Sequence, residues 1–266
     1  MPKRGEEQMK KKKQRALIAV MSTCLAVSMM PTQVFALGTP GIIGSVETAA
    51  EKTKSERTTY RLADGFCIMG EDDSKWRANS KNSVAIEVQH GDLYYENGAV
   101  RNTAKNVFLH TVDAADFTIS VKLDFKPDQN FQSAGLIIYR DENANFAATR
   151  RYHSYFENKS LCTQGVNGKS FPESHIADPS QEQAPIYLQI EKKGTKVISS
   201  YRWSEAEAWT KYNEQTWSSF EGAKGSDLSV GFYTGNSNSN GSTATFSDFT
   251  IQYEGEAAEK VDIFEE

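Results

Sequence analysis

Residues 116–153 read DFTISVKLDFKPDQNFQSAGLIIYRDENANFAATRRYH, and this stretch decides the fold class. Positions 117–123 alternate apolar and polar side chains, which is the two-residue period of a strand with one buried face. A run of turn formers follows at 126–130, and residues 134–139 are then almost continuously apolar, as in a central strand that is covered on both faces. A second turn at 141–145 returns the chain. These features predict adjacent antiparallel strands of a β-sandwich.

The rest of the chain repeats this pattern at intervals of roughly 8 to 14 residues, with hairpin-forming dipeptides such as Asn97-Gly98 and Lys193-Gly194 between the segments. Strands are predicted outside the opening stretch at 84–89, 92–95, 106–111, 159–164, 186–191, 195–203, 227–234 and 243–253. Residues 205–209 are expected to close a hairpin. Many short strands with almost no helical pattern indicate an all-β domain of two stacked antiparallel sheets.

One strand changes parity within its own length. In 243–253 the apolar positions are even-numbered up to Phe246 and odd-numbered afterwards, so a β-bulge or sharp bend is predicted at Ser247-Asp248. An acidic side chain at a bend near the rim of a sandwich can ligate calcium, and it can equally be a solvated turn residue. The sequence indicates no particular cofactor, and calcium near Asp248 stays an open alternative.

The first 36 residues have the organisation of a signal peptide. A basic region at 10–15 precedes an apolar region at 16–30, and Val34-Phe35-Ala36 supplies small residues for cleavage. The apolar region is shorter than the roughly 20 residues that span a bilayer as a helix. We therefore expect cleavage, a secreted extracellular protein and no stable membrane insertion afterwards.

The predicted organisation after the signal peptide has three parts. Residues 37–59 form a linker, 60–254 the sandwich, and 255–266 an acidic tail that we expect to be loose. Loss of the signal peptide lowers the 30 basic residues by seven and the 35 acidic residues by two, which leaves a net charge of about −10. Such a surface repels phosphates, so nucleic acid is not expected as a partner.

Two cysteines remain in the mature chain, Cys67 and Cys162. Export permits a disulfide between them. The other interpretation is that they are two separate small hydrophobic residues on strands. The sequence does not report the distance between them, so both readings stay open.

Three segments resemble a known family. WRANSKNSVAIEVQHGDLYYE at 76–96, DFTISVKLDFKPDQNFQSAGLIIYRDENANF at 116–146 and IYLQIEKKGTKVISSYRW at 186–203 look like the concanavalin A-like sandwich at the C-terminus of family 43 glycoside hydrolases of the β-xylosidase type, and like related secreted sandwich domains of unknown function. The resemblance implies a jelly roll of the lectin and glucanase type that is associated with carbohydrate. In those enzymes a separate propeller domain carries the catalytic carboxylates, and this sequence has no room for one.

The sequence motifs of catalytic sandwiches are also missing. Glucanases of this class resemble one another in an E-x-D-x-x-E strand, lyases carry a Gln-x-His strand, and neither pattern occurs here. No Cys/His group has the spacing of a zinc site. We therefore predict a noncatalytic module that binds carbohydrate or accompanies glycosidases. The alternatives are a glycoside hydrolase or polysaccharide lyase of the jelly-roll class, and an extracellular structural or protein-interaction module.

Sugars bind to flat aromatic rings and to side chains that exchange hydrogen bonds with hydroxyl groups. Alternation places Tyr233 on the outward face of its strand, and arginines on central strands indicate an exposed concave face. The predicted ligand-binding residues are Tyr139, Arg140, Arg150, Tyr152 and Tyr233. The alternative for the arginines is that they pair with carboxylates instead of a ligand.

Overall fold

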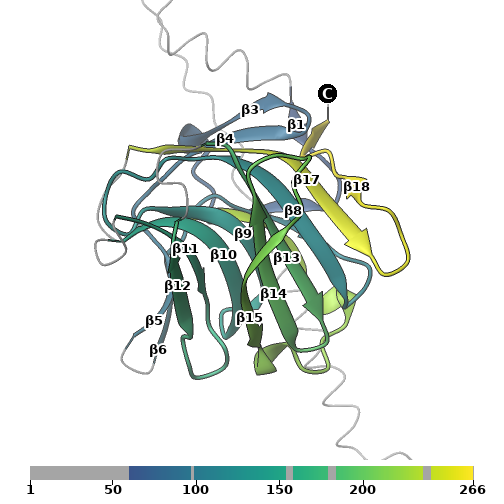
Figure 1. Cartoon of the computed structure of the whole chain (residues 1–266). Helices are drawn as coiled ribbons and strands as arrows, with labels where there is room; N and C mark the ends of the chain where they lie inside the picture. Colours follow the sequence, from purple (N-terminus) through teal and green to yellow (C-terminus); the bar gives the residue numbers. More distant parts are fainter. Residues whose placement is uncertain (1–59, 97–98, 154–157, 179–183, 236–240, 266) are drawn as a thin grey trace, which may run out of the picture. The chain divides into compact units, whose positions relative to one another are not determined.

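The computed structural model describes residues 60–265 except 97–98, 154–157, 179–183 and 236–240. The predicted signal peptide and linker therefore lie outside the described residues. Within the described part, no helix combines the length and hydrophobicity needed to cross a bilayer. The fold is all-β, as the sequence predicted, and its two main sheets are stacked as a sandwich (Figure 1).

The first sheet has β9 as its central strand, and we call it the β9 sheet. All its strand pairs are antiparallel. Its spatial order is β12 (Glu173–Ala177), β11 (Asn158–Gln164), β10 (Ala144–His153), β9 (Ser133–Asp141), β16 (Ser229–Gly235), β7 (Val107–Thr111) and β2 (Phe66–Met69).

The second sheet is built around β8 and is called the β8 sheet. Its order is β15 (Thr210–Thr216), β14 (Lys196–Arg202), β13 (Ile186–Lys193), β8 (Phe117–Asp124), β17 (Thr243–Tyr253), β4 (Ser83–Glu87) and β3 (Trp76–Ser80), and β18 (Glu259–Lys260) pairs with β17. Two small sheets complete the fold, β5 (Leu93–Glu96) with β6 (Ala99–Asn102) and β1 (Arg61–Leu62) with β19 (Phe264–Glu265). Short 3₁₀ turns lie at Asp73–Lys75, Ser218–Phe220 and Gly225–Asp227.

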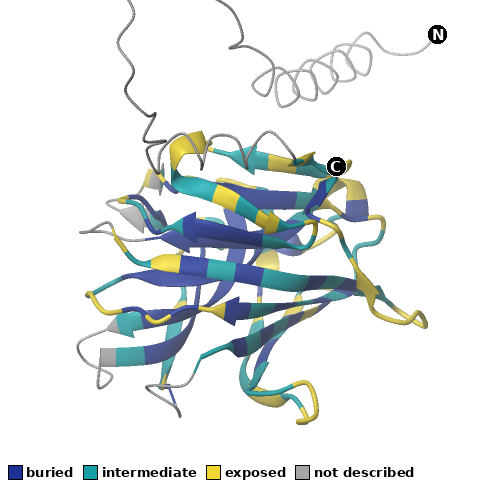
Figure 2. Cartoon of the chain, turned by 90° about the horizontal axis from the view of Figure 1, so that it is seen from above, coloured by how far each residue is buried: buried dark blue, intermediate teal, exposed yellow. Residues whose placement is uncertain are grey.

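The main core lies between the two sheets, where buried residues of each sheet face the other (Figure 2). Alternation along each strand sends every second side chain into this space. Aromatic rings form its centre: Phe232 stacks on Phe108 at 5.3 Å and on Phe246 at 4.6 Å between ring centroids. Offset ring pairs of this kind add to the stabilisation that burial provides.

A second apolar cluster lies on the other side of the β9 sheet. Ile137 from β9 and Tyr233 from β16 pack there against Leu93 and Ala104. Leu93 and Ala104 lie within residues 91–96 and 99–106, which together we call the covering segment. Strand β9 is therefore buried on both faces, as its continuous apolar sequence predicted.

The predicted bulge in β17 is confirmed. The register of β17 against β8 shifts between Ser247 and Thr250, and Asp248 has a φ of 53°. The Asp248 carboxylate accepts a hydrogen bond from Lys260 Nζ at 2.8 Å. This ion pair links the bulge to β18.

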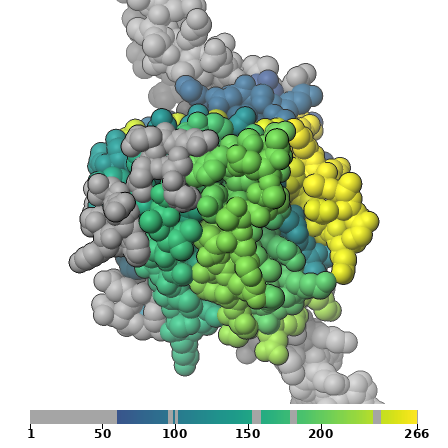
Figure 3. Space-filling model, viewed as in Figure 1, coloured from purple at the N-terminus to yellow at the C-terminus, as the bar shows by residue number. Residues whose placement is uncertain are grey.

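The prediction of a loose C-terminal tail is wrong. Ile263 and Phe264 are fully buried, and the Phe264 ring stacks on Trp76 at 5.6 Å between centroids. These two apolar residues hold an otherwise acidic segment against the domain, and β18 and β19 add strand pairing. In the space-filling view the C-terminal residues form a continuous part of the surface (Figure 3).

The backbone at Asp248 provides a test of the bulge. Asp248→Val and Asp248→Gly both remove the ion pair with Lys260, but only valine is strained at positive φ. We expect Asp248→Val to lower the free energy of unfolding by about 1–2 kcal/mol more than Asp248→Gly does, measured by urea denaturation. Equal losses in the two variants would contradict the left-handed conformation.

Candidate functional site

Polar side chains gather on the outward face of the β9 sheet. The register places Cys162 of β11 opposite His175 of β12, and Gln164 opposite Glu173. Arg151 of β10 lies opposite Ser160 of β11. Because alternate residues of a strand share a face, the side chains of Arg151, Cys162, Gln164, Glu173 and His175 all point away from the main core.

Arg151 is the centre of this group, with a side chain that is only 9% exposed. Its Nη1 donates to Glu173 Oε1 at 2.6 Å and also to Gln164 Oε1. The guanidinium carbon lies 5.2 Å from the centroid of the Phe131 ring. A carboxylate, an amide and an aromatic face thus compensate the burial of the charge.

Asp92 joins the group from the covering segment. Its Oδ1 accepts from the Leu93 backbone N–H at 2.8 Å and from Gln164 Nε2 at 3.5 Å. Burial raises the pKa of the Asp92 carboxyl to about 6, although the charge of Arg151 acts in the opposite direction. Gln164 Nε2 also donates to Tyr233 Oη at 2.8 Å, so Gln164 connects Arg151, Asp92 and Tyr233.

A cavity of about 390 Å³ opens beside these residues. Its lining combines polar groups with aromatic rings: His90, Gly91, Asp92, Tyr94, Thr103, Phe131, Arg151, Gln164, Phe171 and Glu173. Phe131 has a φ of 71°, which is uncommon for an aromatic residue, and its backbone N–H donates to Tyr152 O at 2.8 Å. Backbone conformations of this kind concentrate at ligand-binding sites.

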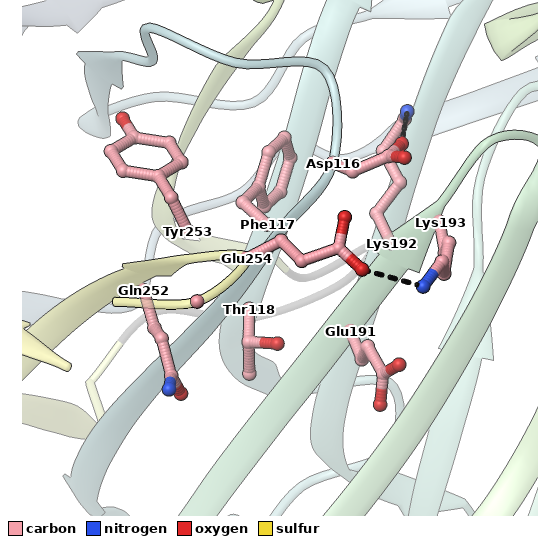
Figure 4. Close-up of a pocket in the computed structure, with 10 residues that line it drawn as sticks. Asp116, Phe117, Thr118, Glu191, Lys192, Lys193, Gln252, Tyr253 and Glu254 are labelled. Carbon is pink, nitrogen blue, oxygen red and sulfur yellow. Dashed lines mark hydrogen bonds and ion pairs between the residues drawn. The ribbon is translucent and has the colours of Figure 1, made fainter. Parts of the chain in front are cut away.

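A second hollow, of about 300 Å³, lies at the ends of β8, β13 and β17 (Figure 4). The ion pair between Lys193 Nζ and Glu254 Oε1, 3.0 Å apart, extends across it. Lys192 Nζ donates a hydrogen bond to the Ala115 carbonyl at 2.7 Å. Both lysines of this hollow are thus engaged within the protein, and we regard the cavity beside Arg151 as the better candidate.

Two of the predicted binding residues, Tyr233 and Tyr139, do lie on the outward side of the β9 sheet. The prediction that Tyr233 is an open platform is nevertheless wrong, because the covering segment buries it completely. Tyr139 is half-buried in the same apolar cluster, and burial raises its pKa to about 12. Both rings hold the covering segment in place.

The other three predicted residues lie away from the cavity. Arg150 is fully buried on the core side, where its Nε donates to Asp178 Oδ2 at 2.7 Å. The prediction that Arg150 is exposed is therefore wrong, and the alternative that it pairs with a carboxylate is confirmed. Arg140 Nη1 donates to Ser219 O at 2.8 Å. Tyr152 follows Arg150 by two residues on β10, so its side chain lies on the same face of the strand, and it is half-buried.

No disulfide joins Cys67 and Cys162. Cys67 is exposed, whereas Cys162 is buried beside Arg151, and burial raises the pKa of the Cys162 thiol to about 12. The disulfide reading of the sequence is therefore not realised.

The comparisons with known proteins agree with the fold. Residues 71–254 match the family described as "Protein of unknown function (DUF1349)", and the chain belongs to that family. No curated protein matches the sequence. The solved structures described next are similar to this chain in fold, and at these low identities the similarity concerns the fold alone. It confirms the concanavalin A-like sandwich that the sequence predicted.

One similar structure is a functionally unknown protein from Saccharomyces cerevisiae, with 14% identity and a TM-score of 0.59 over 71% of this chain and 96% of that one. Another is the GH43 BlXynB protein from Bacillus licheniformis, with 20% identity and a TM-score of 0.58 over 72% of this chain and 37% of that one. A third is a xylan β-1,4-xylosidase from Bacillus halodurans, with 14% identity and a TM-score of 0.59 over 74% and 38%. The chain thus spans little more than a third of the two bacterial proteins.

The buried Asp92 carboxyl predicts a pH-dependent stability. Its raised pKa means that the folded protein holds a proton there between about pH 4 and pH 6 that the unfolded chain has released, so this group lowers stability as pH rises through that window. Asp92→Asn removes the effect. The unfolding free energy of the variant minus that of the natural chain should therefore rise by about 2 kcal/mol from pH 4 to pH 7.

Urea denaturation at both pH values measures this difference. Asp124→Asn, at an exposed position of β8, is the matched control and should show no comparable change. A difference between Asp92→Asn and the natural chain that stays constant with pH would contradict the buried environment of Asp92.

Proposed function

We propose that this DUF1349 protein is exported and binds a carbohydrate, without catalysis, in the cavity beside Arg151. The observation that carries the proposal is the composition of that cavity, in which the buried Arg151 and Gln164 and the more exposed Glu173 meet aromatic rings. Similar sandwiches occur in proteins described as a GH43 protein and a xylan β-1,4-xylosidase, which supports a saccharide as the class of ligand.

The chemistry of the lining suits sugar hydroxyl groups. A hydroxyl both donates and accepts, and the cavity offers the Arg151 guanidinium as donor and the Asp92 and Glu173 carboxyls as acceptors. The rings of Phe131 and Phe171 offer apolar faces for the C–H groups of a sugar ring. The volume of about 390 Å³ lies in the range of small-molecule pockets, roughly 300–1,000 Å³.

A glycan array followed by calorimetry on the hits tests the proposal. Phe171→Ala removes one ring of the cavity and should weaken binding of the best glycan about tenfold, equivalent to roughly 1.4 kcal/mol. Tyr187→Ala is the matched control, because Tyr187 is a partly exposed ring on β13 of the other sheet. Its affinity should equal that of the natural chain.

Two results would contradict the proposal. The first is the absence of binding to any glycan at high protein concentration, which would favour the structural or protein-interaction alternative. The second is an equal affinity in the Phe171→Ala variant and the natural chain, which would leave the function open but exclude this cavity as the site.

One observation favours a glycoside hydrolase as a second candidate function. The cavity contains two carboxyl groups, Asp92 and Glu173, and burial raises the pKa of Asp92 to about 6. Glycosidases need one carboxyl that holds a proton near neutral pH and a second that is ionised. Incubation of each bound glycan with the protein distinguishes the candidates: a shortened product supports hydrolysis, and an unchanged glycan supports binding alone.

Export rests on residues 1–36, whose basic and apolar regions are those of a signal peptide. Mass spectrometry of the protein recovered from the culture medium should find an N-terminus at Leu37. An intact Met1 in that fraction would contradict cleavage.

A further inference from the structure

We propose that Cys162, Glu173 and His175 form a binding site for a divalent metal ion of the zinc class, at the edge of the cavity beside Arg151. The site goes beyond carbohydrate binding and does not depend on it. Among the described residues, these three side chains are a group whose potential ligand atoms all lie within 4.8 Å of one another.

The strands hold the three donors on one face. Cys162 and His175 are opposite each other in the pairing of β11 with β12, and Glu173 precedes His175 by two residues on the same face. The Cys162 sulfur lies 3.7 Å from His175 Nε2 and 3.8 Å from Glu173 Oε1. His175 Nε2 and Glu173 Oε1 are 2.9 Å apart.

These separations approach those of ligands around one zinc ion. With Zn–S of about 2.3 Å and Zn–N of about 2.0–2.1 Å, a tetrahedral angle places sulfur and nitrogen roughly 3.6 Å apart and nitrogen and oxygen roughly 3.3 Å apart. The observed sulfur–nitrogen distance is 3.7 Å. Only a small outward movement of Glu173 is needed, and this side chain is 35% exposed.

The hydrogen bonds of Ser160 turn the imidazole toward the site. Ser160 Oγ donates to the Arg151 carbonyl at 3.4 Å and lies 3.1 Å from His175 Nδ1, so it can accept from the imidazole in the tautomer that has its proton on Nδ1. In that tautomer His175 Nε2 carries a lone pair that faces a carboxylate oxygen and a sulfur. Metal-ligating histidines are oriented by a hydrogen bond at their other nitrogen in the same way.

In the structure the Cys162 thiol donates toward Glu173 Oε1, and Arg151 Nη1 donates to the same oxygen. A metal ion among the three side chains would replace the thiol proton as the link between Cys162 and Glu173, and it would bind His175 Nε2 as well. Metal binding would displace the thiol proton of Cys162 to solvent, forming one metal–sulfur bond as the sulfur–hydrogen bond breaks.

The charges balance with the metal in place. The thiolate and the Glu173 carboxylate neutralise a divalent ion. The Arg151 guanidinium keeps Gln164 as partner and has the Asp92 carboxyl nearby through Gln164 Nε2. Three protein ligands leave one tetrahedral position, and Glu173 lines the cavity, so a water or a ligand hydroxyl there can complete the coordination.

Cobalt(II) provides the test, because a thiolate–cobalt bond gives a near-ultraviolet charge-transfer band. The full chain, first stripped with a chelator, should bind one Co²⁺ with this band and lose it when Zn²⁺ is added. Cys162→Ser should abolish the band, and His175→Gln should weaken Co²⁺ binding by at least about a hundredfold, or roughly 2.7 kcal/mol. Cys67→Ser is the matched control and should keep the full band.

The proposal is overturned if no charge-transfer band appears, as expected when a proton alone bridges His175 and Glu173, or if the band survives Cys162→Ser. Circular dichroism checks that each variant is folded. His175→Gln provides an independent test if Cys162→Ser does not fold, because an undiminished affinity in that variant also overturns the proposal. No glycan enters these measurements, so their failure is distinct from a failure of the carbohydrate proposal.

Discussion

The buried guanidinium of Arg151 is the constraint on which the outward face of the β9 sheet depends. A charge that leaves water is costly unless it is paired and hydrogen-bonded. Arg151 meets this requirement through Glu173 and Gln164, and Gln164 in turn reaches Asp92 and Tyr233. One side chain thus joins three neighbouring strands to the covering segment. Replacement by an apolar residue would remove the guanidinium that donates to Glu173 and whose charge favours the ionised Asp92 carboxyl.

The covering segment converts a sheet face into a cavity. Leu93 and Ala104 bury the apolar half of the face, against Ile137 and Tyr233. The polar half, around Arg151, remains next to the cavity. The same burial that keeps water from Asp92 raises the pKa of its carboxyl. Fold, cavity and electrostatics are therefore consequences of a single packing arrangement, and they place acceptors, donors and rings within one space.

Local patterns in the sequence predicted the interior of the fold well. Every strand at the centre of either main sheet was identified, and the parity change in β17 located its bulge. The four strands at the sheet edges, β12, β2, β15 and β3, were missed. Edge strands bury less of their surface, so their apolar alternation is weaker. Strand β12, with the sequence ESHIA, supplies Glu173 and His175, so this omission concealed part of the site.

The site itself depends on contacts between distant segments. Alternation shows that Arg150 and Arg151 face opposite sides, but it does not show which side is the core. The burial of Tyr233 comes from the covering segment, more than a hundred residues earlier in the chain. The metal donors are distributed over two strands, with Glu-x-His on one and a cysteine on the other, which no zinc-finger spacing would reveal.

The most direct measurement is a crystal structure of the full chain soaked with the glycan that binds most tightly. The account predicts a sugar ring against Phe131 or Phe171, with a hydroxyl in hydrogen-bond contact with Arg151 or Glu173. A sugar found only in the hollow at the ends of β8, β13 and β17, with the cavity beside Arg151 filled by water, would contradict it.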